Sequence, residues 1–160
     1  MEEREKTARL AGQLFRQDGW MNIRSHGISM FPFIKEGDFC RFRAMTGPEL
    51  DHCRRGDVLL FRTDDGRLIG HRLHRVEQRP EGKRYLLKGD ANVRFDDWVS
   101  GSQVLGKLTA IRRGRRSARA DGFLPLFWGR LMLGFPFLSR VLRKGAFNRS
   151  FGPGRKGRSG

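Results

Sequence analysis

Residues 57–78, DVLLFRTDDGRLIGHRLHRVEQ, decide the fold class. The runs 57–63 and 67–78 are rich in residues that favour strands, and the Asp-Asp-Gly sequence at 64–66 between them is typical of a tight turn. Neither run shows the spacing of apolar residues that an amphipathic helix needs. The sequence therefore predicts two antiparallel strands joined by a short hairpin.

Similar runs continue on both sides of this hairpin. The sequence Pro-Glu-Gly at 80–82 predicts the turn of a second hairpin. Further strands are predicted over 39–45, 83–88 and 103–112. Several short strands with tight turns and no helical pattern between them indicate a mainly β fold, which we expect to be an antiparallel, barrel-like domain over residues 23–113.

The two ends of the chain differ in composition from this domain. Residues 1–22 are predicted to contain a short amphipathic helix, and because they have no long apolar run, we expect neither a signal peptide nor a membrane anchor there. Residues 146–160 are rich in Gly and Arg and are predicted to be disordered. The expected location is the cytoplasm or the cytosolic face of a membrane, where the protein would be peripheral.

The net charge of +16 is concentrated near the C-terminus. Residues 107–160 carry 14 Lys and Arg against Asp121 alone, a net charge of +13. Residues 1–106 carry 19 basic against 16 acidic residues and are nearly balanced. A cationic block of this kind favours an anionic surface, which can be membrane lipid, nucleic acid or an acidic partner.

The most apolar stretch, residues 123–142, lies inside this basic block. Its length suits a membrane span, but Arg130 near its middle and the interrupting Pro and Gly residues argue against one. Two alternatives are open for residues 114–145. They form a helical segment that lies in the interface of an anionic membrane, with contacts from residues 112–144, or a helix that packs on the β domain.

The sequence indicates no metal site and no cofactor. Two cysteines, Cys40 and Cys53, form neither a disulfide framework nor a zinc site. Cys40 lies in an alternating strand-like run and is predicted to be a small buried hydrophobic residue. We expect the protein to be a monomer.

The segment GISMFPFIKEGD, residues 27–38, raises the question of catalysis. A serine hydroxyl is a poor nucleophile at neutral pH unless a base lies beside it and a third group orients that base. Ser29 would therefore need a histidine and a carboxylate. His71 and His74 lie three residues apart in one predicted strand, so that only one of them can face Ser29.

Candidate carboxylates follow in two later segments. Asp90 lies in the turn sequence KGDAN, and Asp96 and Asp97 lie in RFDDW. Taken one at a time, these segments are ordinary turn sequences. Their order along the chain is more specific than any one of them.

In order, the segments GISMFPFIKEGD, RRGDVLLFR, GHRLHRV, LLKGDANVRFDDW and QVLGKL resemble the catalytic domain of the type I signal peptidases, over about residues 24–112. The likeness is greatest to the branch found in the endoplasmic reticulum, archaea and some spore-forming bacteria, which uses Ser and His. This resemblance implies a serine endopeptidase that removes leader or signal segments from precursor polypeptides, with a peptide or preprotein as its substrate.

The resemblance assigns roles to particular residues. Ser29 matches the nucleophile and His71 the general base. Asp90 and Asp96 match the two carboxylates of the family, either of which could hold the other ring nitrogen of His71. The positions expected to complete the motif and to contact the substrate are Gly27, Met30, Pro32 and Asn92. The family often has Ser where this chain has Gly27, and Gly where it has Ile28.

Three other hypotheses about function are considered. A nucleic-acid-binding protein would use the cationic block, but no helix-turn-helix, zinc pattern or aromatic strand platform accompanies it, so this reading is not favoured. An inactive peptidase fold would bind peptides without cleaving them. The self-cleaving repressors of the bacterial damage response have a related fold, but they use Lys where this chain has His71.

Overall fold

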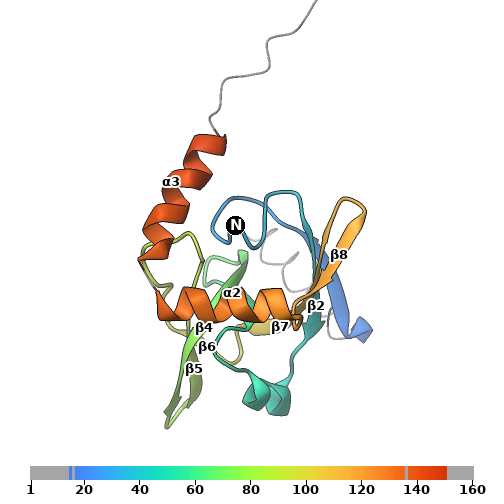
Figure 1. Ribbon diagram of the computed structural model, residues 1–160. Coiled ribbons are helices and arrows are strands. Elements are labelled where there is room, and N and C mark those ends of the chain that lie inside the picture. The colour runs from blue at the N-terminus through green and yellow to red at the C-terminus, as the bar shows by residue number, and fades with distance from the viewer. Residues whose placement is uncertain (1–14, 16, 136, 151–160) are drawn as a thin grey trace, which may run out of the picture.

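The fold is described from a computed structural model of the chain, for Phe15, residues 17–135 and residues 137–150. Eight strands form one antiparallel sheet that curves into a half barrel, with two helices at the C-terminal end (Figure 1). The mainly β fold predicted from the sequence is confirmed. The elements are β1 (Trp20–Arg24), β2 (Phe39–Ala44), η1 (Gly47–His52), β3 (Val58–Arg62), β4 (Leu68–Arg79), β5 (Gly82–Lys88), β6 (Val99–Ser100), β7 (Val104–Arg113), β8 (Arg116–Arg119), α2 (Phe123–Gly134) and α3 (Leu138–Ser150).

The strand order is β1-β2-β7-β3-β4-β5-β6, and β8 pairs with β7. The two predicted hairpins, β3–β4 and β4–β5, both form. In the first turn, the Thr63 N–H donates to the Arg67 carbonyl, and Gly66 takes the left-handed conformation, with φ of 82°, that such turns require. This order brings early and late parts of the chain together, because β7 lies between β2 and β3.

The apolar run VLLF of β3 is buried on both of its faces. Val58 and Leu60 belong to one cluster of buried side chains, whereas Leu59 and Phe61 belong to another. Successive side chains of a strand point to opposite faces, so a continuous apolar run is what a strand between two cores needs. The first cluster also contains Met30, which lies next to Ser29 in the sequence.

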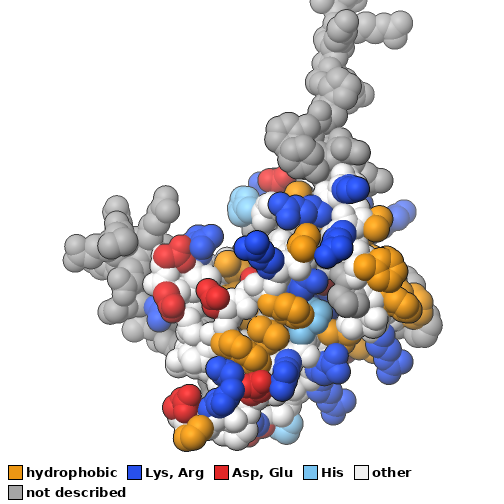
Figure 2. All heavy atoms as spheres, turned by 90° about the vertical axis from the view of Figure 1, so that its left-hand side faces the viewer, with side chains coloured by type: hydrophobic (Ala, Val, Ile, Leu, Met, Phe, Trp, Pro, Cys, Tyr) orange, Lys and Arg blue, Asp and Glu red, His pale blue; other side chains and the backbone are white. Residues whose placement is uncertain are grey.

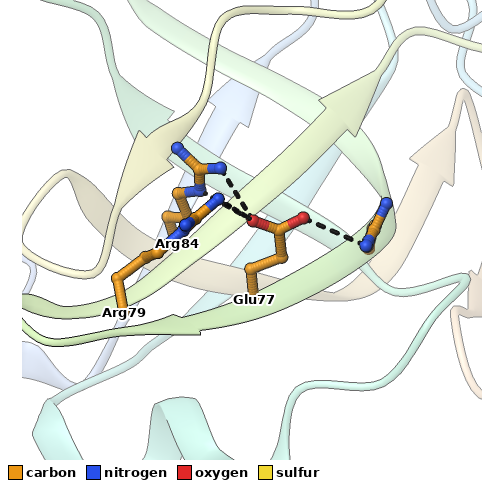
Figure 3. Close-up of polar contacts among 4 residues, drawn as sticks. Glu77, Arg79 and Arg84 are labelled. Carbon is orange, nitrogen blue, oxygen red and sulfur yellow. Dashed lines mark hydrogen bonds and ion pairs between the residues drawn. The ribbon is translucent and has the colours of Figure 1, made fainter.

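The β4–β5 hairpin is held at its exposed end by one carboxylate (Figure 3). Glu77 on β4 faces Arg84 on β5 in the strand register, and the Arg84 Nη2 donates to Glu77 Oε2 at 2.7 Å. Arg79 donates to the same oxygen at 2.9 Å, and Arg75 lies 3.1 Å from Oε1. Directly opposed charges of unlike sign favour one register over its neighbours, so Glu77 helps to set the pairing of the strand that carries His71.

The structure differs from the sequence predictions at both ends of the sheet. The predicted helical segment 1–22 lies largely outside the described residues; Phe15, Gln17 and Asp18 are helical, but β1 already begins at Trp20. β8 extends the sheet beyond residue 113. Every residue of β8 is exposed, so its sequence, RSAR, carries no apolar alternation that would predict a strand.

The C-terminal segment forms two short helices rather than one. Pro125 does not interrupt α2, because it lies in the first turn, where the backbone N–H has no partner within the helix. α3 continues to Ser150, so residues 146–150 of the segment predicted to be disordered are helical, while residues 151–160 lie outside the described part. Among the described residues, none of the helices is long and apolar enough to cross a membrane.

α2 lies across the sheet, and α3 projects away from it (Figure 1). α2 contacts the domain through one face. Met132 is buried, and a Cβ at Gly129 would lie 3.1 Å from Nη1 of Arg72. The alternative in which the segment packs on the β domain is therefore realised for this face of α2, whereas the opposite face remains exposed to solvent.

Candidate active site

Three side chains from distant parts of the chain form a chain of hydrogen bonds. His71 Nε2 lies 3.0 Å from the Ser29 Oγ, and His71 Nδ1 lies 2.7 Å from Oδ2 of Asp96. The imidazole is almost fully buried, with 4% of its residue surface exposed. This is the arrangement of a nucleophile, a base and a group that orients the base.

Each of the three residues is placed by a different structural element. Ser29 lies in the turn between β1 and β2, and His71 lies on β4 opposite Leu59 of β3. Asp96 follows β5, and its backbone N–H donates to the carbonyl of Leu87 at 2.9 Å, which ties the segment to that strand. Asp97 is exposed, so the structure brings the first of the two neighbouring aspartates to His71.

Asp90 lies elsewhere and does not orient His71. Its two carboxylate oxygens accept hydrogen bonds from Nε and Nη2 of Arg72, each at 2.8 Å, and its Oδ2 also accepts one from Trp128 Nε1 at 2.8 Å. The side chains of Arg72 and Asp90 are only 2% and 1% exposed. The sequence left open which carboxylate holds the imidazole. In the structure, Asp96 is the carboxylate that meets His71, whereas Asp90 is a buried partner of Arg72.

Neither Arg72 nor Trp128 was identified from the sequence as part of the site. Arg72 follows His71 on β4 and so points to the other side of the strand, where Nη1 donates to the carbonyl of Gly56 at 2.8 Å. A buried Asp90 needs a cationic partner, which is the signal that could have identified Arg72. Trp128 lies in an apolar stretch that gives no indication of its hydrogen bond.

The turn that carries Asp90 packs directly on the nucleophile. The backbone N–H of Ala91 donates to the carbonyl of Ser29 at 2.8 Å. A Cβ at Gly89 would lie 2.7 Å from that same carbonyl oxygen and 2.8 Å from the side-chain nitrogen of Asn92. The sequence KGDAN therefore positions Ser29 through backbone contact, and glycine is required at position 89 by the close approach.

The other predicted motif residues surround Ser29. Met30 is buried at 4% exposure, and Pro32, which follows a cis peptide bond, is half-buried. Gly27 has a φ of 79° and open space around its Cβ position, so its backbone conformation, rather than lack of room, favours glycine there. A serine at this position, as in the resembling family, would be strained.

A cavity of about 330 Å³ opens beside Ser29 and His71, and both residues line it. Its walls are largely apolar, with contributions from Ile23, Met30, Ile34, Phe42 and Leu60, while Arg24, Ser25 and His26 add polar groups. Cys40 also lines it, and burial raises the pKa of that thiol to about 12, so it behaves as a small apolar side chain. The volume is in the range of pockets that hold small ligands or side chains.

The backbone N–H of Ser29 is a candidate hydrogen-bond donor to the substrate. The Phe31 N–H donates to the carbonyl of Ile28, and the Ile34 N–H to that of Met30. Within the described part of the chain, no protein acceptor is found for the N–H of Ser29 itself. That group is available to a developing negative charge on a carbonyl oxygen attacked by Ser29.

His74 does not reach Ser29. It is the extra residue of a bulge between Leu73 and Arg75, and its ring meets the Phe95 ring edge-on at 5.1 Å. Lys88 lies over the ring of Phe95, with its Nζ 5.3 Å from the ring centroid. Burial, and next the nearby Lys88 ammonium, lower the pKa of His74 to about 4.

His74 should make the fold sensitive to acid. The pKa of His74 in the folded chain, about 4, lies below the ordinary value of 6.5. Between these two pH values, His74 is therefore protonated in the unfolded chain and neutral in the folded chain. Stability conferred by the neutral ring is full above pH 6.5 and is lost as the pH falls towards 4. The free energy of unfolding is measured by urea denaturation at pH 7 and at pH 4.5. Between these pH values, His74→Gln should lose less stability than the unmodified chain. The control His52→Gln, at an exposed position, should lose as much as the unmodified chain. Equal losses in all three proteins would contradict this assignment.

Comparison of the chain with family models, with curated proteins and with solved structures gives no match. Among the described residues, no group of three or more His, Cys, Asp or Glu side chains is placed to hold a metal ion. The resemblance to the type I signal peptidases therefore rests on the quoted motifs, and the chemistry is argued from the geometry of Ser29, His71 and Asp96.

Proposed function

We propose that the protein is a serine endopeptidase of signal-peptidase type, with Ser29 as nucleophile and His71 as general base. The observation that carries this proposal is the pair of hydrogen bonds that joins Ser29 to His71 and His71 to Asp96. Segments 42 and 25 residues apart in the sequence contribute the three groups. The sequence motifs predict Ser29 and His71 in these roles, and they include Asp96 as one of two carboxylates that could hold the imidazole.

The positions of these atoms support a reaction in two stages. The Ser29 Oγ attacks the scissile carbonyl carbon, and its proton passes to His71 Nε2. Asp96 accepts the hydrogen bond from Nδ1 and stabilises the imidazolium. The Ser29 N–H donates to the oxyanion. When the intermediate collapses, the C–N bond breaks and His71 gives its proton to the leaving amine. A water molecule, deprotonated by His71, then attacks the acyl ester. The bond from the acyl carbon to the Ser29 Oγ breaks, and His71 returns the proton to Oγ.

The substrate is an extended segment of a precursor polypeptide. β1 is an edge strand of the described sheet, and Ile23 and Arg24 at its end line the cavity beside Ser29. An extended peptide can add to such an edge by main-chain hydrogen bonds while a side chain next to the cleaved bond enters the cavity. We expect small side chains near the bond, in leader or signal segments of the precursor.

Loss of Ser29 should remove a defined set of cleavages. New protein N-termini are compared by terminal peptide mass spectrometry in cells that express the unmodified chain, Ser29→Ala or Ser117→Ala at matched levels. Ser117 is an exposed serine on β8 and serves as the control. N-termini present with the unmodified chain and with Ser117→Ala but absent with Ser29→Ala would identify the substrates.

Identical N-termini in all three samples would overturn the peptidase proposal. An inactive fold that binds peptides would then be tested by comparing the peptides that co-purify with the unmodified chain and with Ser29→Ala.

A further inference from the structure

The outer face of α2 is apolar and basic. Trp128, Gly129 and Met132 lie on the side that contacts the domain. Leu126 and Phe127 are on the other side, at 55% and 56% exposure. Positions three or four residues apart share a helix face, so Arg130 lies on the same exposed side as Leu126 and Phe127.

The corner between α2 and α3 continues this apolar surface. Phe135 and Phe137 are 50% and 59% exposed, and their rings meet edge-on with centroids 6.0 Å apart. The two rings contact each other and still leave half of their surface to water. Val141, one turn after Phe137, is 61% exposed. Neighbouring large apolar side chains with this exposure mark an interaction surface.

Basic side chains flank the apolar ones. Residues 122–145 contain Arg130, Arg140, Arg143 and Lys144, all exposed, and no acidic residue. Figure 2 shows hydrophobic side chains flanked by Lys and Arg side chains on the side of the molecule where α2 and α3 lie. We name the α2–α3 surface as Leu126, Phe127, Arg130, Phe135, Phe137, Arg140, Val141, Arg143 and Lys144.

We propose that the α2–α3 surface binds a bilayer that contains anionic phospholipid. The aromatic and aliphatic side chains enter the boundary between headgroups and acyl chains, and the four basic side chains contact lipid phosphates. The short described helices suit a position in the plane of the interface, since none of them could span a membrane. Nucleic acid would use the charges but leave the exposed phenylalanines without a role.

Membrane binding would also fix the position of the catalytic residues. Trp128 on the inner face of α2 donates to Asp90, and the neighbouring Ala91 N–H donates to the Ser29 carbonyl. α2 is thus joined to the turn that supports Ser29, so a bilayer bound to its outer face holds the candidate site at a set distance. The binding itself does not depend on the proposed peptidase activity.

Flotation of the full chain with vesicles tests the proposal. The vesicles contain phosphatidylcholine alone or with phosphatidylglycerol. We expect binding to the anionic vesicles only, weakened by salt. Phe135→Ser/Phe137→Ser/Val141→Ser should lower the affinity at least about 10-fold, because apolar burial contributes to interfacial binding. Arg140→Gln/Arg143→Gln/Lys144→Gln should lower it roughly 100-fold. Ser29→Ala should bind as the unmodified chain does.

Matched controls separate this surface from general charge and general apolarity. Arg43→Gln/Arg67→Gln/Arg79→Gln removes three exposed basic groups, from β2, the turn before β4 and the end of β4. Val76→Ser removes an exposed apolar group from β4. Both should retain binding within a few-fold. The proposal is overturned if anionic vesicles are not bound, if the two charge variants lose affinity equally, or if the apolar variant binds normally.

Two further measurements on the same proteins identify other occupants. Sedimentation without lipid would reveal a second copy on the surface, if the apolar variant abolished self-association. Titration with a DNA duplex would reveal a nucleic-acid surface, if the charge variant lost DNA affinity and the apolar variant did not. Either result, with no vesicle binding, overturns the proposal.

Discussion

Replacing Asp96 by asparagine should lower the rate of peptide cleavage by roughly 10³- to 10⁴-fold and leave the fold intact. Oδ2 of Asp96 lies 2.7 Å from His71 Nδ1. A carboxylate there requires a proton on Nδ1, which leaves Nε2 free to accept the proton of Ser29. An amide removes this requirement and also the negative charge that stabilises the imidazolium formed during attack.

Asp97→Asn is the matched control for this experiment. Asp97 is the next residue in the chain and is exposed, so its substitution changes the same charge without touching His71. Both variants are assayed on the precursor whose new N-terminus disappears in Ser29→Ala, and both melting temperatures are measured. Equal rates for Asp96→Asn and the unmodified chain would show that Asp96 does not act through His71. A fall in the cleavage rate of Asp97→Asn would show that the role belongs to Asp97 rather than to Asp96.

The sheet could largely be predicted from the sequence because its strands follow local rules. β2 alternates buried and exposed residues without exception, and the hairpin after β3 has a glycine where the turn requires a left-handed residue. β1 and β8 lack such signals. β8 is fully exposed, so only its pairing with β7 makes it a strand, and pairing is a property of the fold rather than of four residues.

The candidate site shows where sequence reasoning ends. The order of the motifs predicts Ser29 and His71 as candidates, because each lies in a short segment of recognisable sequence. The choice between Asp90 and Asp96 depends on which partner each carboxylate meets, and this is set by tertiary packing. Trp128, 38 residues after Asp90 in the chain, takes part in that packing. No pattern within one segment carries this information.

Replacing Asp90 by alanine should destabilise the fold by about 3–5 kcal/mol, a large part of the stability of an ordinary domain. Among the described residues, the hydrogen-bond and ring partners left to the buried Arg72 guanidinium are then the Gly56 carbonyl and the Phe33 ring, 4.8 Å away. An uncompensated buried charge is much more costly than a missing surface ion pair. Asp65→Ala, which removes the exposed partner of Arg67, should change the free energy of unfolding far less than Asp90→Ala does.

A double variant distinguishes the loss of a charge partner from the loss of side-chain packing. Arg72→Met/Asp90→Leu removes both charges and should recover most of the stability, because a buried ion pair contributes little beyond an apolar pair of similar volume. Trp128→Phe leaves the Arg72–Asp90 pair in place and should cost about 1.5–3 kcal/mol, as expected for one hydrogen bond to a charged group. Urea denaturation of the four variants gives these free energies. If Asp90→Ala instead kept its stability and lost only cleavage, Asp90 would act on the reaction directly, and the division of roles between the two aspartates would have to be reversed.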